Sequence, residues 1–197
     1  LPFAPTAPPL QSYCDGSLVS DLQATPPLGS SVTWFTAETG GTQLPVNQLL
    51  VPGYYYAESN AEADDLASQE QSNSKINPLP VVVINTPAAV CSPNTVDLTQ
   101  AAVTLGSTPG LTFTYWLNAG ATVLYPTPTT AGAGTYYIKG TTAAGCSDIE
   151  PVTVTVNPTP DVTTAGATTI CSGTTTNISL SSLVPGTSFS WTIGTIT

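Results

Sequence analysis

Alternating apolar and polar residues run through this chain in short stretches, and the same succession of stretches occurs three times. Each succession begins with a Pro-containing lead and a cysteine, followed by a polar segment with an apolar pair and by an aromatic segment. In the first two successions a Tyr-rich segment comes next. Alternation with a period of two is typical of half-buried strands, and outside residues 57–71 no helical period is sustained. The pattern therefore predicts an all-β protein made of three related units.

The repetition divides the chain into tandem β-sandwich units at residues 1–85, 86–157 and 158–197. Residues 81–84 and 152–156 are rich in Val, and we expect them to form the strands that close the first and second units. The third unit has its first strands but no Tyr-rich or closing strand. We therefore expect it to be incomplete, because it would expose sheet edges and half of a core to water.

Each aromatic segment places one large side chain between small polar residues, namely Trp34, Tyr115 and Trp191. One buried aromatic residue is enough to anchor the core of a small sandwich, so we expect these three side chains inside. Trp116 directly follows Tyr115, and alternation points its indole to the opposite face. There it would contact a neighbouring domain, which is the simpler interpretation, or stack on a glycan.

Charged residues make up only 7% of the sequence, and 12 acidic residues stand against two basic ones, Lys75 and Lys139. The net charge of −10 argues against nucleic acid as a partner. No apolar run approaches the roughly 18 residues that span a bilayer, so we expect no membrane span in this fragment. Histidine is absent and neither lysine lies in a nucleophile motif, which predicts that the protein is not an enzyme.

Five of the acidic residues lie close together in the first unit, at Glu58, Glu62, Asp64, Asp65 and Glu70. Carboxylates on one loop are potential calcium ligands, but the alternating Asp-x-Asp spacing with a turn glycine is missing. A solvated surface loop accounts for these charges. The sequence therefore predicts neither a metal site nor a cofactor.

The cysteines, Cys14, Cys91, Cys146 and Cys171, lie far apart in the sequence. Zinc and redox sites need CxxC pairs or neighbouring histidines, and the sequence has neither. A structural disulfide formed in an oxidising compartment is the better interpretation, and it points to an extracellular protein.

Short motifs in each unit resemble a known group of repeats. They are Tyr13-Cys14 and Gly53-Tyr54-Tyr55 in the first unit, Gly134-Thr135-Tyr136-Tyr137 and Gly145-Cys146-Ser147-Asp148 in the second, and Ile170-Cys171-Ser172-Gly173 and Phe189-Ser190-Trp191 in the third. These motifs resemble the Ig-like and PKD-like repeats of Bacteroidetes surface proteins, which include giant gliding-motility adhesins exported by the type IX secretion system. The resemblance implies small β-sandwiches at the cell surface, the third being the opening half of a PKD-like repeat. It identifies a scaffold but no ligand.

Within the second unit, Cys91 precedes the first core strand and Cys146 lies in the turn between the last two strands. A bridge between them would clamp distant parts of one domain, so we predict a disulfide between Cys91 and Cys146. Members of the resembled family place a cysteine after the Tyr-Tyr strand, but residues 60–68 contain none. Cys14 is then free, buried or joined to another chain, and buried is the simplest of these. The resemblance implies that Cys171 pairs with a residue beyond Thr197.

Together these features predict a non-catalytic fragment of a secreted, repeat-built cell-surface adhesin or stalk. Its tandem sandwiches would serve as spacer and adhesion modules, with a surface glycan or a neighbouring protein as partner. One alternative is the self-associating subunit of an extracellular filament or sheath, in which strand exchange between subunits completes the third unit. Another is a carbohydrate-binding accessory module that uses Trp116 or the tyrosines as its platform.

Overall fold

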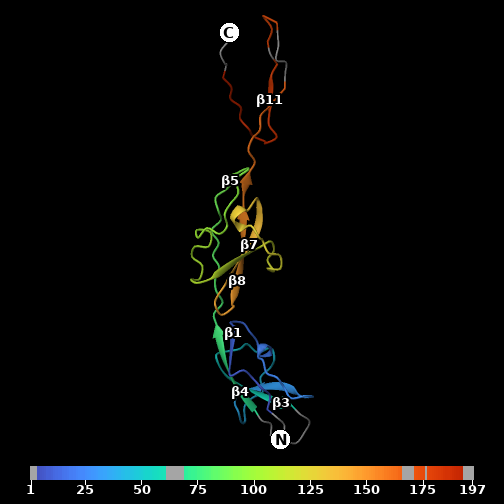
Figure 1. Cartoon of the computed structure of the whole chain (residues 1–197), viewed down its shortest axis with the longest axis vertical. Coiled ribbons are helices and arrows are strands. Elements are labelled where there is room, and N and C mark those ends of the chain that lie inside the picture. The colour runs from blue at the N-terminus through green and yellow to red at the C-terminus, as the bar shows by residue number, and fades with distance from the viewer. Residues whose placement is uncertain (1–3, 61–68, 166–170, 176, 193–197) are drawn as a thin grey trace.

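The computed structural model describes residues 4–60, 69–165, 171–175 and 177–192. It shows a long, narrow molecule in which the units follow one another end to end, with the first and third units at opposite ends (Figure 1). The regular structure of the described residues consists of strands β1 to β11 and two short 3₁₀ segments, η1 (Val19–Asp21) and η2 (Pro128–Thr130). The prediction of an all-β protein is confirmed.

The first unit contains a four-stranded sheet in the order β1-β4-β3-β2. Its strands are β1 (Leu10–Cys14), β2 (Ser31–Phe35), β3 (Gly53–Asn60) and β4 (Gln69–Asn77). Strand β1 runs parallel to β4, whereas β4, β3 and β2 are antiparallel neighbours. The aromatic, Tyr-rich and last strands therefore lie side by side, as the C, F and G strands of an Ig-like sandwich do.

Alternation along these strands fills the core of the first unit. Trp34 of β2 and Tyr55 and Ala57 of β3 are buried in one cluster with Val19 and Leu22, which come from the η1 region. The prediction that Trp34 anchors this core is therefore confirmed.

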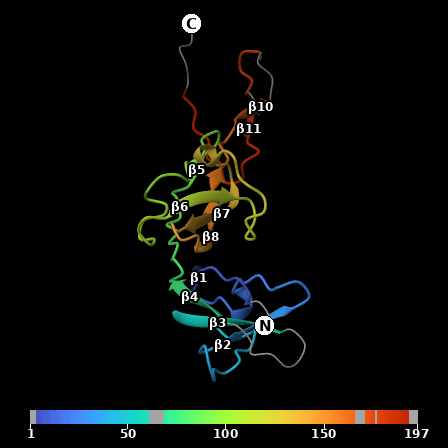
Figure 2. The same cartoon turned by 60° about the horizontal axis from the view of Figure 1, so that its bottom comes forward.

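The second unit repeats this arrangement with a divided last strand. Its strands are β5 (Val90–Cys91), β6 (Thr112–Trp116), β7 (Gly134–Thr141), β8 (Ser147–Val154) and β9 (Val156–Asn157). Strands β6, β7 and β8 form an antiparallel sheet (Figure 2). Strand β5 pairs in parallel with β9. Strand β5 thus pairs in parallel with the last strand of its unit, as β1 does with β4.

A tyrosine of the Tyr-rich strand ties each of these two units to its preceding loop. The Tyr55 hydroxyl donates to the Val51 carbonyl and accepts from the Val51 N–H, both at 2.9 Å. The Tyr136 hydroxyl donates to the Gly132 carbonyl at 3.2 Å. A tyrosine that reaches back to the backbone a few residues upstream at the start of strand F is a hallmark of Ig-like sandwiches. The first two units are therefore Ig-like.

The core of the second unit combines strand residues of β7 and β8 with apolar residues from the segments before β6 and β7. Ile138, Val152 and Leu98 are almost fully buried, and Tyr115 of β6 packs against them. The rings of Tyr125 and Tyr136 meet at a centroid distance of 4.5 Å. Tyr115 therefore faces this core, as predicted, but it is only half-buried.

Residues 81–84 pack on the second unit, so the prediction that they close the first unit is wrong. The Val81 N–H donates to Thr108 Oγ1, and the Thr108 N–H donates to the Val81 carbonyl, both at 2.9 Å. The side chain of Val82 is buried beside Gly140 of β7. Pro78 and Pro80 explain the difference, because two residues without a backbone N–H interrupt the pairing after β4 and leave the apolar run to the next unit.

The third unit consists, in its described residues, of an antiparallel pair of short strands, β10 (Thr163–Ala165) and β11 (Ser179–Ser181). Trp191 is 78% exposed, which contradicts its predicted place in a core. In the other two units the aromatic strand is covered by its neighbour, since Trp34 pairs with Ala57 and Tyr115 with Ile138. Among the described residues no strand covers Trp191 in this way.

Candidate functional site

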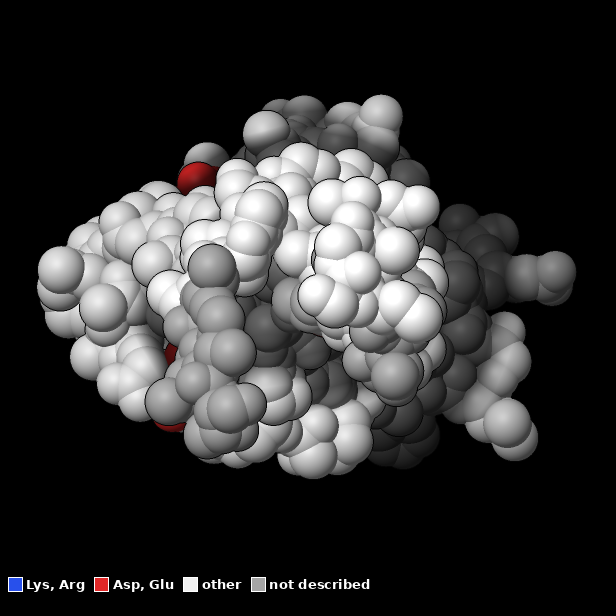
Figure 3. All heavy atoms as spheres, turned by 90° about the horizontal axis from the view of Figure 1, so that it is seen from above, with Lys and Arg blue, Asp and Glu red and all other residues white. Residues whose placement is uncertain are grey.

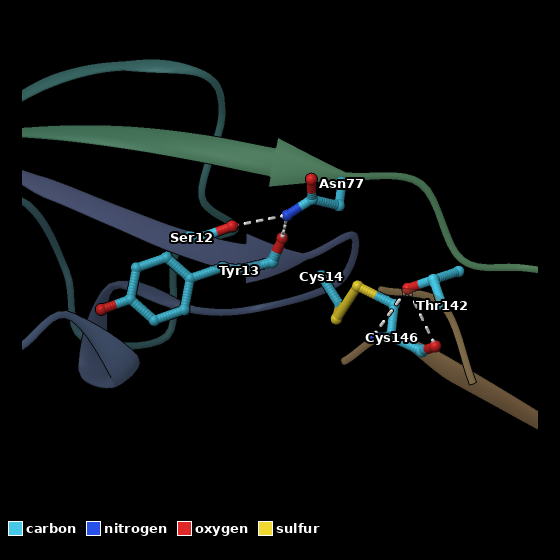
Figure 4. The surroundings of a disulfide bond; sticks show 6 residues. All are labelled: Ser12, Tyr13, Cys14, Asn77, Thr142 and Cys146. Atoms are coloured by element: carbon cyan, nitrogen blue, oxygen red, sulfur yellow. Dashed lines mark hydrogen bonds between the residues drawn. A yellow bond between two sulfur atoms is a disulfide. The ribbon is translucent and has the colours of Figure 1, made fainter. Parts of the chain in front are cut away.

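The first unit contributes the ends of β1 and β4 to its junction with the second unit. Cys14, the last residue of β1, lies opposite Asn77, the last residue of β4. The Asn77 side-chain amide donates to Ser12 Oγ at 2.8 Å and to the Tyr13 carbonyl at 2.9 Å (Figure 4). The Asp15 N–H donates to the Asn77 carbonyl at 2.8 Å. The chain therefore leaves the first unit from a fixed position beside Cys14.

The turn between β7 and β8 approaches from the second unit. Thr142 closes this turn, since its N–H donates to the Cys146 carbonyl at 2.8 Å and its hydroxyl oxygen accepts from the Cys146 N–H at 3.1 Å. Gly145 has a φ of +87°, a conformation that glycine adopts without strain. Cys146 is only 1% exposed, because it is covered at the junction.

A disulfide joins Cys14 to Cys146 across this junction, with a Cα–Cα distance of 5.5 Å and a sequence separation of 132 residues (Figure 4). The predicted pairing of Cys91 with Cys146 is therefore wrong. Cys14 is neither free nor joined to another chain. Cys91 is free and exposed.

The position of each cysteine in the second unit explains this correction. Strand β5, which ends at Cys91, lies at the end of the unit that faces the third unit, whereas the β7–β8 turn faces the first unit (Figure 1). The length of the domain thus separates Cys91 from Cys146, although both belong to it. The cysteine that the first unit lacks after its Tyr-rich strand is supplied by the second unit.

A hydrogen bond beside the disulfide ties the incoming chain to the same turn region. The Val82 N–H donates to Asp148 Oδ2 at 2.8 Å, and Asp148 follows Cys146 by two residues. The residues between Asn77 and Val82 are therefore held at both ends, with the disulfide spanning them. A disulfide and a hydrogen bond therefore connect the two units at this junction.

Tyr13 adds a half-buried polar contact next to Cys14. Its hydroxyl donates to Gln11 Oε1 and to the Asp21 carbonyl. Burial raises the pKa of this phenol, and the nearby carboxylate of Asp21 raises it further, against the lowering effect of a hydrogen bond from Gln23. The raised pKa keeps the Tyr13 phenol neutral, so it acts as a hydrogen-bond donor at this junction.

Trp116, the predicted contact residue, is half-exposed at the end of β6. Its indole N–H donates to Thr114 Oγ1 at 2.9 Å, so the ring lies along the face that Thr114 occupies. Tyr115 packs on the core from the other face, in agreement with alternation. A role of Trp116 in binding a glycan or a protein stays a prediction.

The acidic cluster of the first unit is only partly within the described residues. Glu58 lies in β3 and Glu70 in β4, and Gln69 Nε2 donates to Glu58 Oε2 at 2.7 Å. Glu62, Asp64 and Asp65 lie outside the described residues. Among the described residues no group of His, Cys, Asp and Glu is arranged to hold a metal ion, and no helix is long and apolar enough to cross a membrane.

An apolar groove opens on the third unit. Ile178, Leu180, Phe189 and Trp191 line a volume of about 570 Å³. Viewed from this end, the visible surface of the described residues shows no basic side chain and only scattered acidic ones (Figure 3). The groove is therefore suited to an apolar occupant.

No family model and no curated protein matches the sequence. Solved structures that match include insect hemolin, with 12% identity over 78% of this chain and 47% of hemolin, and a TM-score of 0.26. Sidekick-1 immunoglobulin domains 1–4 match with 15% identity, coverage of 92% and 57%, and a TM-score of 0.29. A chimeric titin Z1Z2 tandem matches with 10% identity, coverage of 78% and 96%, and a TM-score of 0.27.

The chain spans about half the length of hemolin and of the four-domain Sidekick-1 fragment that it matches. The assignment to the Ig-like class follows from features of the chain itself, namely the order of its strands and the two tyrosine hydrogen bonds. The first two units therefore have an Ig-like fold in tandem, and a disulfide joins them.

Proposed function

We propose that this chain is a non-catalytic spacer of a secreted cell-surface adhesin or stalk, and that its sandwiches hold a binding region away from the cell. The observation that carries the proposal is the Cys14–Cys146 disulfide. A flexible linker alone lets two domains reorient freely, whereas a covalent bond across the linker leaves them little freedom. A stiff junction is what a spacer requires.

Two further features support an extended, rigid course. The linker after the first unit contains Pro78 and Pro80, and the linker after the second contains Pro158 and Pro160. Proline fixes φ and favours an extended backbone, so both linkers act as short spacers. A disulfide persists in an oxidising environment, which supports an extracellular location.

The division into units belongs to this proposal. We propose three units, as the repeats indicate, at about residues 1–85, 86–157 and 158–197, with the first boundary moved to the linker at 78–80. The hydrogen bonds of Val81 and Val82 to the second unit support this change. The resemblance to gliding-motility adhesins of the type IX secretion system, and a glycan or neighbouring protein as partner of Trp116, are part of the same proposal.

Nuclear magnetic resonance in a weakly aligned sample tests the stiffness of the junction. In the oxidised chain the residual dipolar couplings of the first and second units should fit one common alignment tensor. In the Cys14→Ser, Cys146→Ser double variant the two units should need different tensors, while the chemical shifts inside each unit stay close to those of the parent chain. Different tensors in the oxidised chain would refute the spacer.

A filament subunit is the second candidate, and the open groove of the third unit favours it. An exposed sheet edge beside an apolar groove is the arrangement that strand exchange between subunits completes. This candidate predicts regular polymers by electron microscopy and a mass that rises with protein concentration. The spacer predicts a monomer under the same conditions.

A carbohydrate-binding module is the third candidate, and the half-exposed indole of Trp116 would be its contact residue.

A further inference from the structure

The sheets of the first and second units carry an aromatic pair at matching positions on their outer faces. Buried residues alternate with half-buried or exposed ones along β3 and β7, so Tyr56 of β3 and Tyr137 of β7 point away from the cores. Phe35 of β2 lies opposite Tyr56, and Trp116 of β6 lies opposite Tyr137. Both sheets therefore present a partly exposed aromatic pair to their surroundings.

The side chains that flank this pair differ between the two units. In the first unit they are Gln43 and Gln71, and in the second unit they are Leu124 and Pro151. We call these sets the polar row, which is Gln43, Phe35, Tyr56 and Gln71, and the apolar row, which is Leu124, Trp116, Tyr137 and Pro151. The first unit builds the same strand arrangement with glutamines at the ends of its row, so the fold does not require the exposed Leu124 and Pro151. An exposed apolar row of this kind marks a contact surface.

Charges of opposite sign lie beside the two rows. Glu58 and Lys139 each follow the tyrosine of their row by two residues, so they are on the same outer faces. Each also lies opposite a threonine of the aromatic strand, Thr33 for Glu58 and Thr114 for Lys139. Lys139 is one of only two basic residues in a chain with a net charge of −10. The two faces are therefore alike in register and opposite in charge.

Side chains on both faces are held in place before any partner arrives. The Trp116 indole N–H donates to Thr114 Oγ1 at 2.9 Å, and Thr114 lies opposite Lys139, so the ring extends along the sheet toward the lysine. On the first unit, Gln69 Nε2 donates to Glu58 Oε2 at 2.7 Å. Ordered side chains lower the entropic cost of binding.

The arrangement of the units decides which copies of these faces can meet. The first two units follow one another along the molecule, and the Cys14–Cys146 disulfide prevents the second from folding back onto the first (Figure 1). Two identical faces packed on the same row would bring like charges together, either Lys139 with Lys139 or Glu58 with Glu58, which is unfavourable. The face that complements the second unit is therefore the first unit of another chain.

We propose that the outer face of the second unit binds the outer face of the first unit of a second copy of this chain. In this contact the apolar row packs on the polar row, and Lys139 of one copy pairs with Glu58 of the other. The inference rests on the proposed function, which includes a neighbouring protein as the partner of Trp116, and it names that partner.

Each such contact is small. A row crosses four neighbouring segments that lie about 4.8 Å apart, so it spans only about 15 Å. One pair of faces therefore buries less than the roughly 1,600 Å² of a standard protein–protein interface. Separate chains remain monomeric at micromolar concentration, and the contact acts between chains that stand side by side at high local concentration. A spacer with this contact joins laterally to its neighbours.

The test uses the full 197-residue chain with its Cys14–Cys146 bond intact. Chain labelled with ¹⁵N is kept at micromolar concentration, and unlabelled chain is added up to about 1 mM, where a weak contact becomes populated. Nuclear magnetic resonance spectra then report which amides change their surroundings. We expect shifts at both rows and at the Trp116 indole N–H, while the amides of the third unit stay in place.

Exchange of the two charges provides the decisive variants. Glu58→Lys and Lys139→Glu should each reduce the shifts by at least about fivefold, because like charges then face each other across the contact. A mixture of these two single variants should restore the shifts, and so should the double variant, because opposite charges meet again. The matched control is Glu38→Lys, which makes the same change of charge at an exposed position outside both rows. It should behave as the parent chain does.

Four outcomes would overturn the inference. They are an absence of shifts at the highest concentration, shifts that survive both single variants, shifts confined to the third unit, which would indicate strand exchange, and a Trp116 indole signal that responds to soluble dextran but not to added chain, which would assign the face to a glycan. None of them affects the alignment tensors of the first two units. A common tensor without contact between chains would therefore reject this inference and leave the spacer in place.

Discussion

At the scale of single residues, the buried amide of Gln11 holds three parts of the first unit together. Gln11 is only 7% exposed. Its Nε2 donates to the Gln23 carbonyl at 3.0 Å and to Ser72 Oγ at 2.9 Å, and its Oε1 accepts from the Gln23 N–H at 2.8 Å. The side chain therefore connects β1 to β4 and to the segment after η1, and its polar atoms are satisfied.

Replacing Gln11 with Leu should lower the free energy of unfolding of the first unit by about 2–4 kcal/mol. The leucine removes a hydrogen-bond partner of the buried Ser72 hydroxyl and of the part-buried Gln23 N–H and carbonyl, and each buried group left without a partner costs roughly 1–3 kcal/mol. Chemical denaturation measures the change. The matched control is Gln71→Leu, since Gln71 is exposed and its side chain bonds to the Tyr56 hydroxyl at the surface. A Gln11 variant as stable as this control would contradict the assignment.

Asp161 gives the third unit a pH dependence. Hydrogen bonds from the Leu183 N–H and from the Ser182 hydroxyl hold the pKa of this carboxyl below its usual value. A lowered pKa in the folded state adds stability above the unfolded value, near about 3.9, and this contribution is lost as the pH falls through the folded value. The Leu183 amide should therefore exchange faster relative to its intrinsic rate below this range. In Asp161→Asn the exchange of the Leu183 amide should lose this pH dependence. If the pH dependence persists in that variant, another group is responsible for it.

At the scale of elements, the close approach of residues 81–84 to β7 decides where the first unit ends. A Cβ added at Gly140 would lie 2.7 Å from both Val82 Cγ2 and Leu111 Cδ1. Only a glycine allows these side chains to reach the backbone of β7. Because position 140 has no side chain, residues 81–84 can pack on the second unit.

Gly140→Ala should destabilise the second unit by roughly 1–3 kcal/mol, because overpacking pushes Val82 and Leu111 apart from the sheet. Thermal or chemical denaturation measures the loss. Adding Val82→Ala should restore part of it, which a strand belonging to the first unit would not do. Gly120→Ala is the control, since its Cβ would meet no atom closer than 3.8 Å, and it should change stability by less than about 0.5 kcal/mol.

At the scale of the whole molecule, the disulfide changes how the chain carries tension. It joins two cysteines that lie 132 positions apart in the sequence, and it encloses most of the first two units. A crosslink over a loop of this length removes unfolded-state entropy worth about 5 kcal/mol on the chain-entropy model. Tension applied to the two ends passes through the sulfur atoms and bypasses the enclosed segment.

When single molecules are stretched by their ends, the oxidised and the reduced chain should therefore reach different contour lengths. In the oxidised chain the segment between Cys14 and Cys146, which are 132 positions apart, should contribute nothing to the extension. After reduction, or in the Cys14→Ser, Cys146→Ser variant, the fully stretched chain should gain roughly 440–470 Å, at about 3.3–3.6 Å for each residue. The Cys91→Ser, Cys171→Ser variant should behave as the parent chain does. The same contour length in both redox states would show that this bond does not form.

At the candidate site, the sequence predicted the kinds of residue but not their pairing. It indicated structural disulfides, a buried Trp34 and a strand position for Trp116. It assigned Cys146 to Cys91 because both lie in one repeat, and it placed residues 81–84 in the first unit because a Val-rich run resembles a last strand. Both errors concern which end of a domain, or which domain, a segment faces.

The sequence by itself determined the all-β class, the threefold repetition and the alternation that buries Trp34. These features depend on contacts between near neighbours in the chain, which a period of two records directly. Only the tertiary structure decided that Cys14 meets Cys146, that Val82 belongs to the second unit and that Trp191 lies in an open groove. These depend on how whole units stack along the molecule, and a local pattern contains no information about the distance between two ends of a folded sandwich.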